Sequence, residues 1–230
     1  MHANTLLCGK GETVVSLAGF MNMDMSYPGI SIKVELTVLA EYLDGMEQGI
    51  SAVCDSYILK EEEKNKGLPH YEFSYIYEVA KYEIPRVIKL PYLVTLYSLF
   101  ESSILSLLKY AKKKEGKEIS VKDIKGKTLI SSYNKYMQHI LNYDFYFNQK
   151  TMSGFSELNK LRNCIAHSNG NLDPRNTELK KLLSSNSRIS ELNGQLDVSY
   201  DYLQDAFGFI AEAIRELMKY MELRYFEQKS

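Results

Sequence analysis

The chain has 230 residues, of which 45% are hydrophobic and 25% charged, so it can bury the core of one domain with an elaboration, or of two small domains. Its formal net charge of −1 at pH 7 excludes a globally basic nucleic-acid-binding protein, although a local basic patch can still form. The cysteines Cys8, Cys54 and Cys164 stand far apart and are odd in number, which predicts no disulfide framework and fits a reducing, cytoplasmic setting. The four histidines are widely scattered, so we expect neither a zinc site nor another metal site.

The first 30 residues differ in character from the rest of the chain. They have neither the charged region nor the continuous apolar region of a signal peptide, and nowhere does an apolar run approach the roughly 18 residues of a membrane span. Residues 26–29, SYPG, form a turn signal. We therefore expect an N-terminal arm over 1–30 ahead of a single bundle over 31–228, with no membrane segment.

Three stretches in the first half of the chain predict helices. Over 32–57, apolar residues recur at alternating spacings of four and three, which indicates a long amphipathic helix with a seam of coiled-coil type. Residues 71–84 fit either a strand or a short helix that ends before Pro85, and we favour the helix because its neighbours are helical. After Pro91, apolar residues on one face predict a helix that ends at the lysines 112–114.

The second half of the chain predicts three more helices and a hairpin. Two helices are expected over about 121–141 and 153–168, with Gly170 just beyond the end of the latter. An Asn-Gly pair between two alternating runs predicts a β-hairpin over 188–199. A last helix follows over 203–221. The predicted fold is all-α, an up-and-down antiparallel bundle with a small β-hairpin before the last helix.

The segment LRNCIAHSNG, residues 161–170, places an arginine and a histidine five residues apart at the end of an apolar helix. At about 100° per residue, Arg162 lies about 40° from the core residue Leu158 and His167 about 180° from it, so the two are about 140° apart. Asn163 lies one turn before His167, on the same side. One copy of the helix does not bring these groups together, whereas a second copy related by a two-fold axis could join them in one cleft.

Arg162, Asn163 and His167 resemble the R-x4-6-H signature of the HEPN superfamily, in which a polar residue often follows the arginine. The upstream segment LYSLFESSILSLL, residues 96–108, is similar to the second helix of that family, whose acidic residue would be Glu101. In helix order the likeness covers roughly residues 30–225. It is greatest to the toxin, abortive-infection and RNA-cleaving branches.

The resemblance implies a homodimer, formed through the helix that carries Arg162 and His167, which cleaves RNA without a metal or another cofactor. His167 would act as general base or acid at the 2′-hydroxyl or the leaving 5′-oxygen, a role that imidazole commonly serves near neutral pH. Arg162 would hold the scissile phosphate and offset charge in the transition state, and Asn163 would orient His167 or the phosphate. The product would carry a 2′,3′-cyclic phosphate.

The same resemblance implies a partner protein, either an antitoxin or another component of a defence system. HEPN toxins that pair with nucleotidyltransferase antitoxins carry a tyrosine two residues after the histidine, as the target of modification. Asn169 occupies that position in this chain, so we do not expect regulation by that route.

Two further groups of residues are candidates for the site. Glu101 falls on an apolar arc, where an unpaired carboxylate would be costly, so we expect Arg162 as its partner, either within a catalytic arrangement or as a plain salt bridge. The segment 109–127 holds eight lysines against three acidic residues. Its members Lys112, Lys113 and Lys114 would form an RNA-binding lip beside the site, or else an ordinary solvated helix end.

A second hypothesis is a non-catalytic helical dimer that binds RNA, a nucleotide or a partner protein. The near-neutral charge and the angle between Arg162 and His167 favour it.

Overall fold

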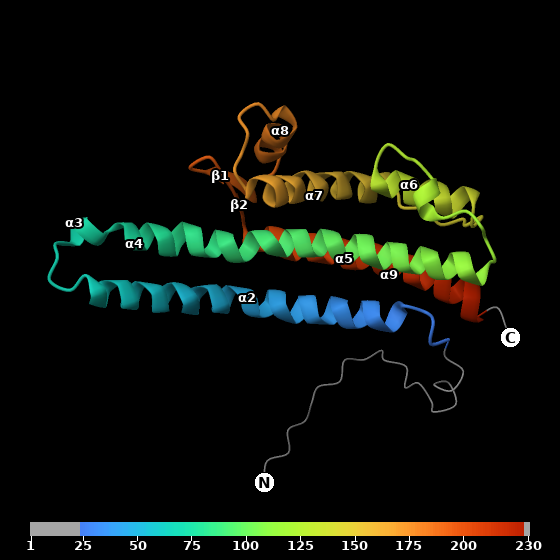
Figure 1. Cartoon of the computed structure of the whole chain (residues 1–230), viewed down its shortest axis with the longest axis horizontal. Helices are drawn as coiled ribbons and strands as arrows, with labels where there is room; N and C mark the ends of the chain where they lie inside the picture. The colour runs from blue at the N-terminus through green and yellow to red at the C-terminus, as the bar shows by residue number, and fades with distance from the viewer. Residues whose placement is uncertain (1–23, 228–230) are drawn as a thin grey trace, which may run out of the picture.

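The first long helix, α2, spans Gly29–Lys64 in a computed structural model that describes residues 24–227. Its buried side chains include Ile32, Leu36, Leu43 and Met46, which follow the predicted seam. None of its residues after Met46 is fully buried. The second half of α2 therefore runs past the main core. Together with the residues that follow it, up to residue 78, it forms a projection at the left end of Figure 1, which we call the arm (residues 47–78) and which is distinct from the N-terminal segment 1–30.

The return helix is continuous where the sequence predicts a break. Short helices α3 (His70–Phe73) and α4 (Tyr75–Glu78) lead through a π-helical turn, η1 (Val79–Glu83), directly into α5 (Ile84–Lys114). The prediction that a helix ends before Pro85 and another begins after Pro91 is thus wrong. The wider turn of η1, in which the Ile84 N–H bonds to the Val79 carbonyl five residues earlier, directly precedes Pro85. Because the hydrogen-bond register already changes there, a proline, which has no N–H to donate, is accommodated without a break in the helix. Pro91 lies inside α5 and has no N–H to donate to the Val87 carbonyl one turn earlier. Both residues are exposed, so water can bond to that carbonyl.

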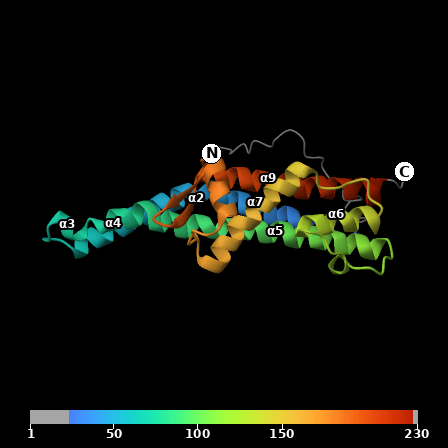
Figure 2. The same ribbon diagram turned by 90° about the horizontal axis from the view of Figure 1, so that it is seen from above.

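The middle of the chain forms an upper layer over α5. A 3₁₀ turn, η2 (Val121–Asp123), and helix α6 (Leu129–His139) stand in place of one predicted helix over 121–141. Helix α7 (Gln149–Ser168) begins at Asn148, whose Oδ1 accepts the Thr151 N–H at 3.0 Å. Viewed from above, α7 crosses α5 and α9 obliquely (Figure 2).

The hairpin and the last helix match their predictions closely. Strands β1 (Ile189–Leu192) and β2 (Gln195–Val198) pair antiparallel around Asn193 and Gly194, both in the left-handed region. Helix α9 (Tyr200–Glu222) follows and passes into a π-helical turn, η3 (Leu223–Glu227). The predicted all-α bundle with a small hairpin before its last helix is confirmed, with successive long helices running in opposite directions (Figure 1).

Helix α5 is the centre of the core, because it contacts α2, α7 and α9. Its fully buried side chains include Leu93, Phe100 and Ile104. The ring centroids of Phe100 and Phe155 lie 3.8 Å apart, which joins α5 to α7. Each such buried side chain contributes about 1.5–3 kcal/mol by leaving water. The helix with the arginine–histidine motif is thereby fixed along its inner face.

Candidate functional site

The motif lies at the C-terminal end of α7, which stops in left-handed backbone. Asn169 has a φ of 51° and Gly170 a φ of 78°, and the backbone N–H groups of both donate to the Cys164 carbonyl. Gly170 lies beyond the helix end, as predicted. A Cβ atom there would lie 2.9 Å from Leu90 Cδ1 of α5, so any side chain at this position would require Leu90 to shift. The end of α7 is therefore seated directly on α5.

Arg162 is half-buried and held in one direction. Its guanidinium carbon lies 5.4 Å from the ring centroid of Tyr97 on α5, a cation–π contact, and its Nη1 donates to Asn163 Oδ1 at 2.9 Å. Its Nε is buried and has no hydrogen-bond partner. Such an unpaired buried donor costs free energy in the folded chain.

The predicted ion pair between Glu101 and Arg162 is wrong: in residues 24–227 Glu101 forms no salt bridge or side-chain hydrogen bond. Glu101 is only half-buried, so an unpaired carboxylate costs less there than it would in the core. It still lies near the ring that supports Arg162. Burial raises the pKa of Tyr97, the charge of Glu101 raises it further, and Arg162 opposes this. Arg162 thus contacts the Tyr97 ring, and Glu101 lies near that ring without bonding to Arg162.

His167 is exposed, and within the described part of the chain its side chain makes no hydrogen bond. Asn163 is half-buried, and its Oδ1 is taken by Arg162. The structure therefore brings Arg162 and Asn163 together but leaves His167 apart, in agreement with the divergence expected from the helix geometry.

The lysines 112–114 do not flank the motif. Lys112 lies about 22 Å along α5 from Tyr97, at about 1.5 Å per residue. Lys114 is paired with Asp24 at 2.9 Å, at the end of the bundle opposite the arm. The prediction of a basic lip beside the site is wrong, because α7 runs antiparallel to α5 and places its C-terminal end near the start of α5.

Sequence reasoning missed Arg86, in the first turn of α5. Its Nη1 donates to the Asn169 carbonyl at 3.3 Å, and its Nη2 pairs with Glu83 at 2.7 Å. No pattern within the sequence connects residue 86 to residue 169. The antiparallel arrangement of α5 and α7 would have to be known first.

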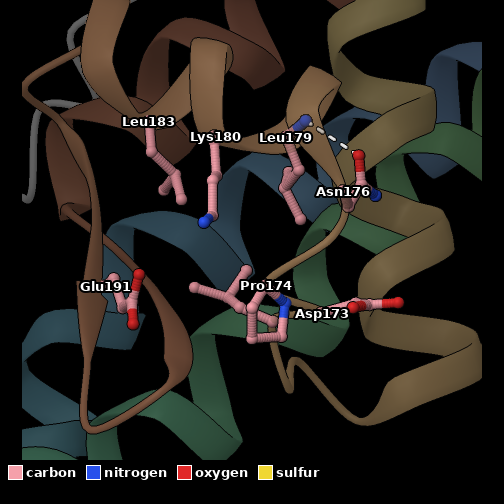
Figure 3. A pocket seen from close by; sticks show the side chains of 8 residues that line it. Asp173, Pro174, Asn176, Leu179, Lys180, Leu183 and Glu191 are labelled. Atoms are coloured by element: carbon pink, nitrogen blue, oxygen red, sulfur yellow. Dashed lines mark hydrogen bonds between the residues drawn. The ribbon is translucent and has the colours of Figure 1, made fainter.

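Helix α8 (Thr177–Ser185) was also missed, and it forms a small pocket next to the motif helix. The signals for α8 are Asn176, whose Oδ1 accepts the Leu179 N–H, and the spacing of Leu179, Leu182 and Leu183. Figure 3 shows the pocket between α8, the loop before it and the hairpin, with Lys180 and Glu191 among its lining residues. Its volume of about 90 Å³ is far below that of a nucleotide-sized site.

Metal-binding groups and apolar helices add little to the site. Within residues 24–227, no three His, Cys, Asp or Glu side chains are close enough to hold a metal ion.

The helical stretch His70–Lys114 is long and apolar enough to cross a membrane, but 56% of its most apolar window is buried in the bundle, as in a core helix. Burial raises the pKa of the Cys164 thiol, which disfavours the reactive thiolate.

Comparisons of the chain with protein-family models, curated proteins and solved structures find no match.

Proposed function

We propose that the chain is a metal-independent endoribonuclease of HEPN type, a toxin or anti-phage effector that cleaves RNA in the cytoplasm. The observation that carries the proposal is the environment of Arg162. Its guanidinium is stacked on Tyr97 and tethered to Asn163 a short way along α7 from the exposed His167. A guanidinium fixed in this way loses little conformational freedom on binding a phosphate.

In the proposed reaction, His167 removes the proton from a ribose 2′-hydroxyl. The 2′-oxygen then bonds to the adjacent phosphorus, and the bond from phosphorus to the 5′-oxygen of the next nucleotide breaks. A second imidazole protonates that oxygen, so the products are a 2′,3′-cyclic phosphate and a 5′-hydroxyl. Arg162 offsets the negative charge on the phosphoryl oxygens, and Asn163 keeps the guanidinium in place.

The second imidazole comes from a second copy of the chain. Arg162 and His167 diverge on α7, so one copy supplies only part of each site. The outward side of α7 carries small and polar residues, including Ser156, Asn163 and Ala166, which permit close approach of another helix. A two-fold dimer through α7 would give two equivalent sites.

The experiment is RNA cleavage by the purified full chain in the presence of EDTA. We expect 2′,3′-cyclic phosphate ends from the wild type, and a loss of about 10²–10⁴-fold in His167→Ala and in Arg162→Ala. His139→Ala, which changes another exposed helix-end histidine, is the matched control and should cleave normally. If His167→Ala and Arg162→Ala both cleave like the wild type, the proposal fails.

The second candidate, a non-catalytic module that binds a partner protein, is favoured by a separate observation. An apolar groove between α2 and α5 is lined by Val34, Val38 and Leu99, and Val34 and Val38 are 57% and 60% exposed. Binding without turnover, unchanged in His167→Ala but lost in Val38→Glu, would favour this candidate over the nuclease.

A further inference from the structure

Arg86 joins the start of α5 to the end of α7. Its side chain is only 11% exposed, which is low for an arginine. One guanidinium nitrogen pairs with Glu83 at 2.7 Å, and another donates to the Asn169 carbonyl at 3.3 Å. The Nε is buried without a partner. Burying the guanidinium costs free energy, and the contacts with Glu83 and Asn169 are what it gains in the folded chain.

The link reaches α7 where the helix most needs support. Asn169 is the C-cap of α7 and comes two residues after His167. Carbonyl groups in the last turn of a helix have no partner within the helix, and a cation stabilises them. On the other side of the same turn, the Gly170 carbonyl accepts the Leu196 N–H of β2 at 2.8 Å. The end of α7 is therefore held between α5 and the hairpin.

We propose that Arg86 is a positioning residue that fixes the end of α7 and so sets the direction in which His167 projects. The catalytic consequence of this rests on the proposed nuclease function, whereas the structural consequence does not. Arg86 does not bind the substrate, because it is almost wholly buried and its outer nitrogens are already engaged by Glu83 and Asn169.

Lys89 offers a matched control one turn further along α5. Its side chain is 13% exposed, and it also links α5 to the layer above, through Asp197 at 2.8 Å and the Val198 carbonyl. It contacts the hairpin, which bonds to Gly170 through Leu196, and it does not contact Asn169. Replacing either cation with glutamine removes a buried charge and a link, so general destabilisation should be similar in the two variants.

The first measurement needs no activity: amide hydrogen exchange of the full chain, together with the NMR signals of the His167 ring. In Arg86→Gln we expect exchange of the Asn169 and Gly170 amides to rise at least tenfold and the ring signals of His167 to shift. Lys89→Gln, which loosens the hairpin bonded to Gly170, should leave the Asn169 amide and the His167 ring near wild type, and Arg86→Lys, which keeps the charge and a donor, should restore part of the protection. Wild-type exchange at these amides in Arg86→Gln would overturn the proposal.

The second measurement is RNA cleavage under saturating and limiting substrate. A misdirected His167 lowers kcat by about 10–100-fold and leaves KM unchanged. A rise in KM at constant kcat would show that Arg86 binds substrate, and would overturn the positioning role. A wild-type chain without any cleavage would overturn the nuclease function instead, while the exchange measurement would still decide whether Arg86 fixes the end of α7.

Discussion

Gly170 is the residue on which the junction between α7 and α5 depends most directly. Its φ of 78° disfavours any side chain, and a Cβ atom would come within 2.9 Å of Leu90 Cδ1. We expect Gly170→Ala to lower the free energy of unfolding by roughly 2 kcal/mol or more, measured by urea denaturation. Gly194 has a φ of 77° with no atom within 4 Å of its Cβ position, so Gly194→Ala should cost only about 1 kcal/mol. Equal losses would show that the contact with Leu90 is unimportant.

At the residue scale, the sequence predicts directions along one helix well and partners between helices poorly. The angle between Arg162 and His167 follows from the helical repeat alone, and the structure agrees with it. The partner of Arg162 does not follow, because Tyr97 and Glu101 lie one turn apart on α5 and both face this region. An aromatic ring and a carboxylate can each attract a guanidinium, and only the packing of α7 on α5 selects the ring.

At the element scale, Pro91 lies inside α5 at a position where the backbone is helical and a proline is unfavourable. Pro91 is exposed inside the helix and leaves the carbonyl one turn earlier without its usual donor. We expect Pro91→Ala to raise the free energy of unfolding by about 1–3 kcal/mol, measured by thermal or urea denaturation. Pro85 directly follows the π-helical turn η1, where the hydrogen-bond register already changes, so Pro85→Ala should change stability by less than about 0.5 kcal/mol. A similar effect of both substitutions would contradict this explanation.

The elements best predicted were those whose signal is local and repeated. The seam of α2, the apolar face of α9 and the Asn-Gly turn are each complete within a short stretch of sequence. The continuity of the return helix from α4 into α5 could not be predicted in this way, because it depends on the π-helical turn η1 ahead of Pro85. A proline in isolation indicates a helix boundary, and only the surrounding backbone shows how the helix accommodates it.

At the scale of the whole molecule, Asp24 ties the beginning of the described chain to the far end of α5. Its Oδ2 accepts hydrogen bonds from Tyr110 and Lys114, both at 2.9 Å, and Lys114 is the main cause that lowers the pKa of this carboxyl. The ionised form is therefore favoured in the folded chain. Its contribution to stability is present above the pKa of an unfolded aspartate, about 3.9, and is lost as the pH falls through the lower folded value.

We accordingly expect Asp24→Asn to be less stable than wild type at pH 7, and the difference to shrink as the pH is lowered below about 4. Urea denaturation across this range measures the effect. Asp55→Asn, at an exposed position of α2 without an ion pair among the described residues, should follow the wild type at every pH. A constant difference between Asp24→Asn and wild type would contradict the assignment.

The support of the motif from α5 constrains which changes in chain length the protein can accept. Arg86 and Tyr97, which hold Asn169 and Arg162 respectively, are separated by close to three full turns of helix and so share one side of α5. A single residue inserted between them would rotate one support by about 100° relative to the other. Insertions in the arm, on the other side of Arg86, leave this spacing intact. Variants of this chain can therefore differ in the length of the arm. A variant that retains the site must retain the number of residues between positions 86 and 97.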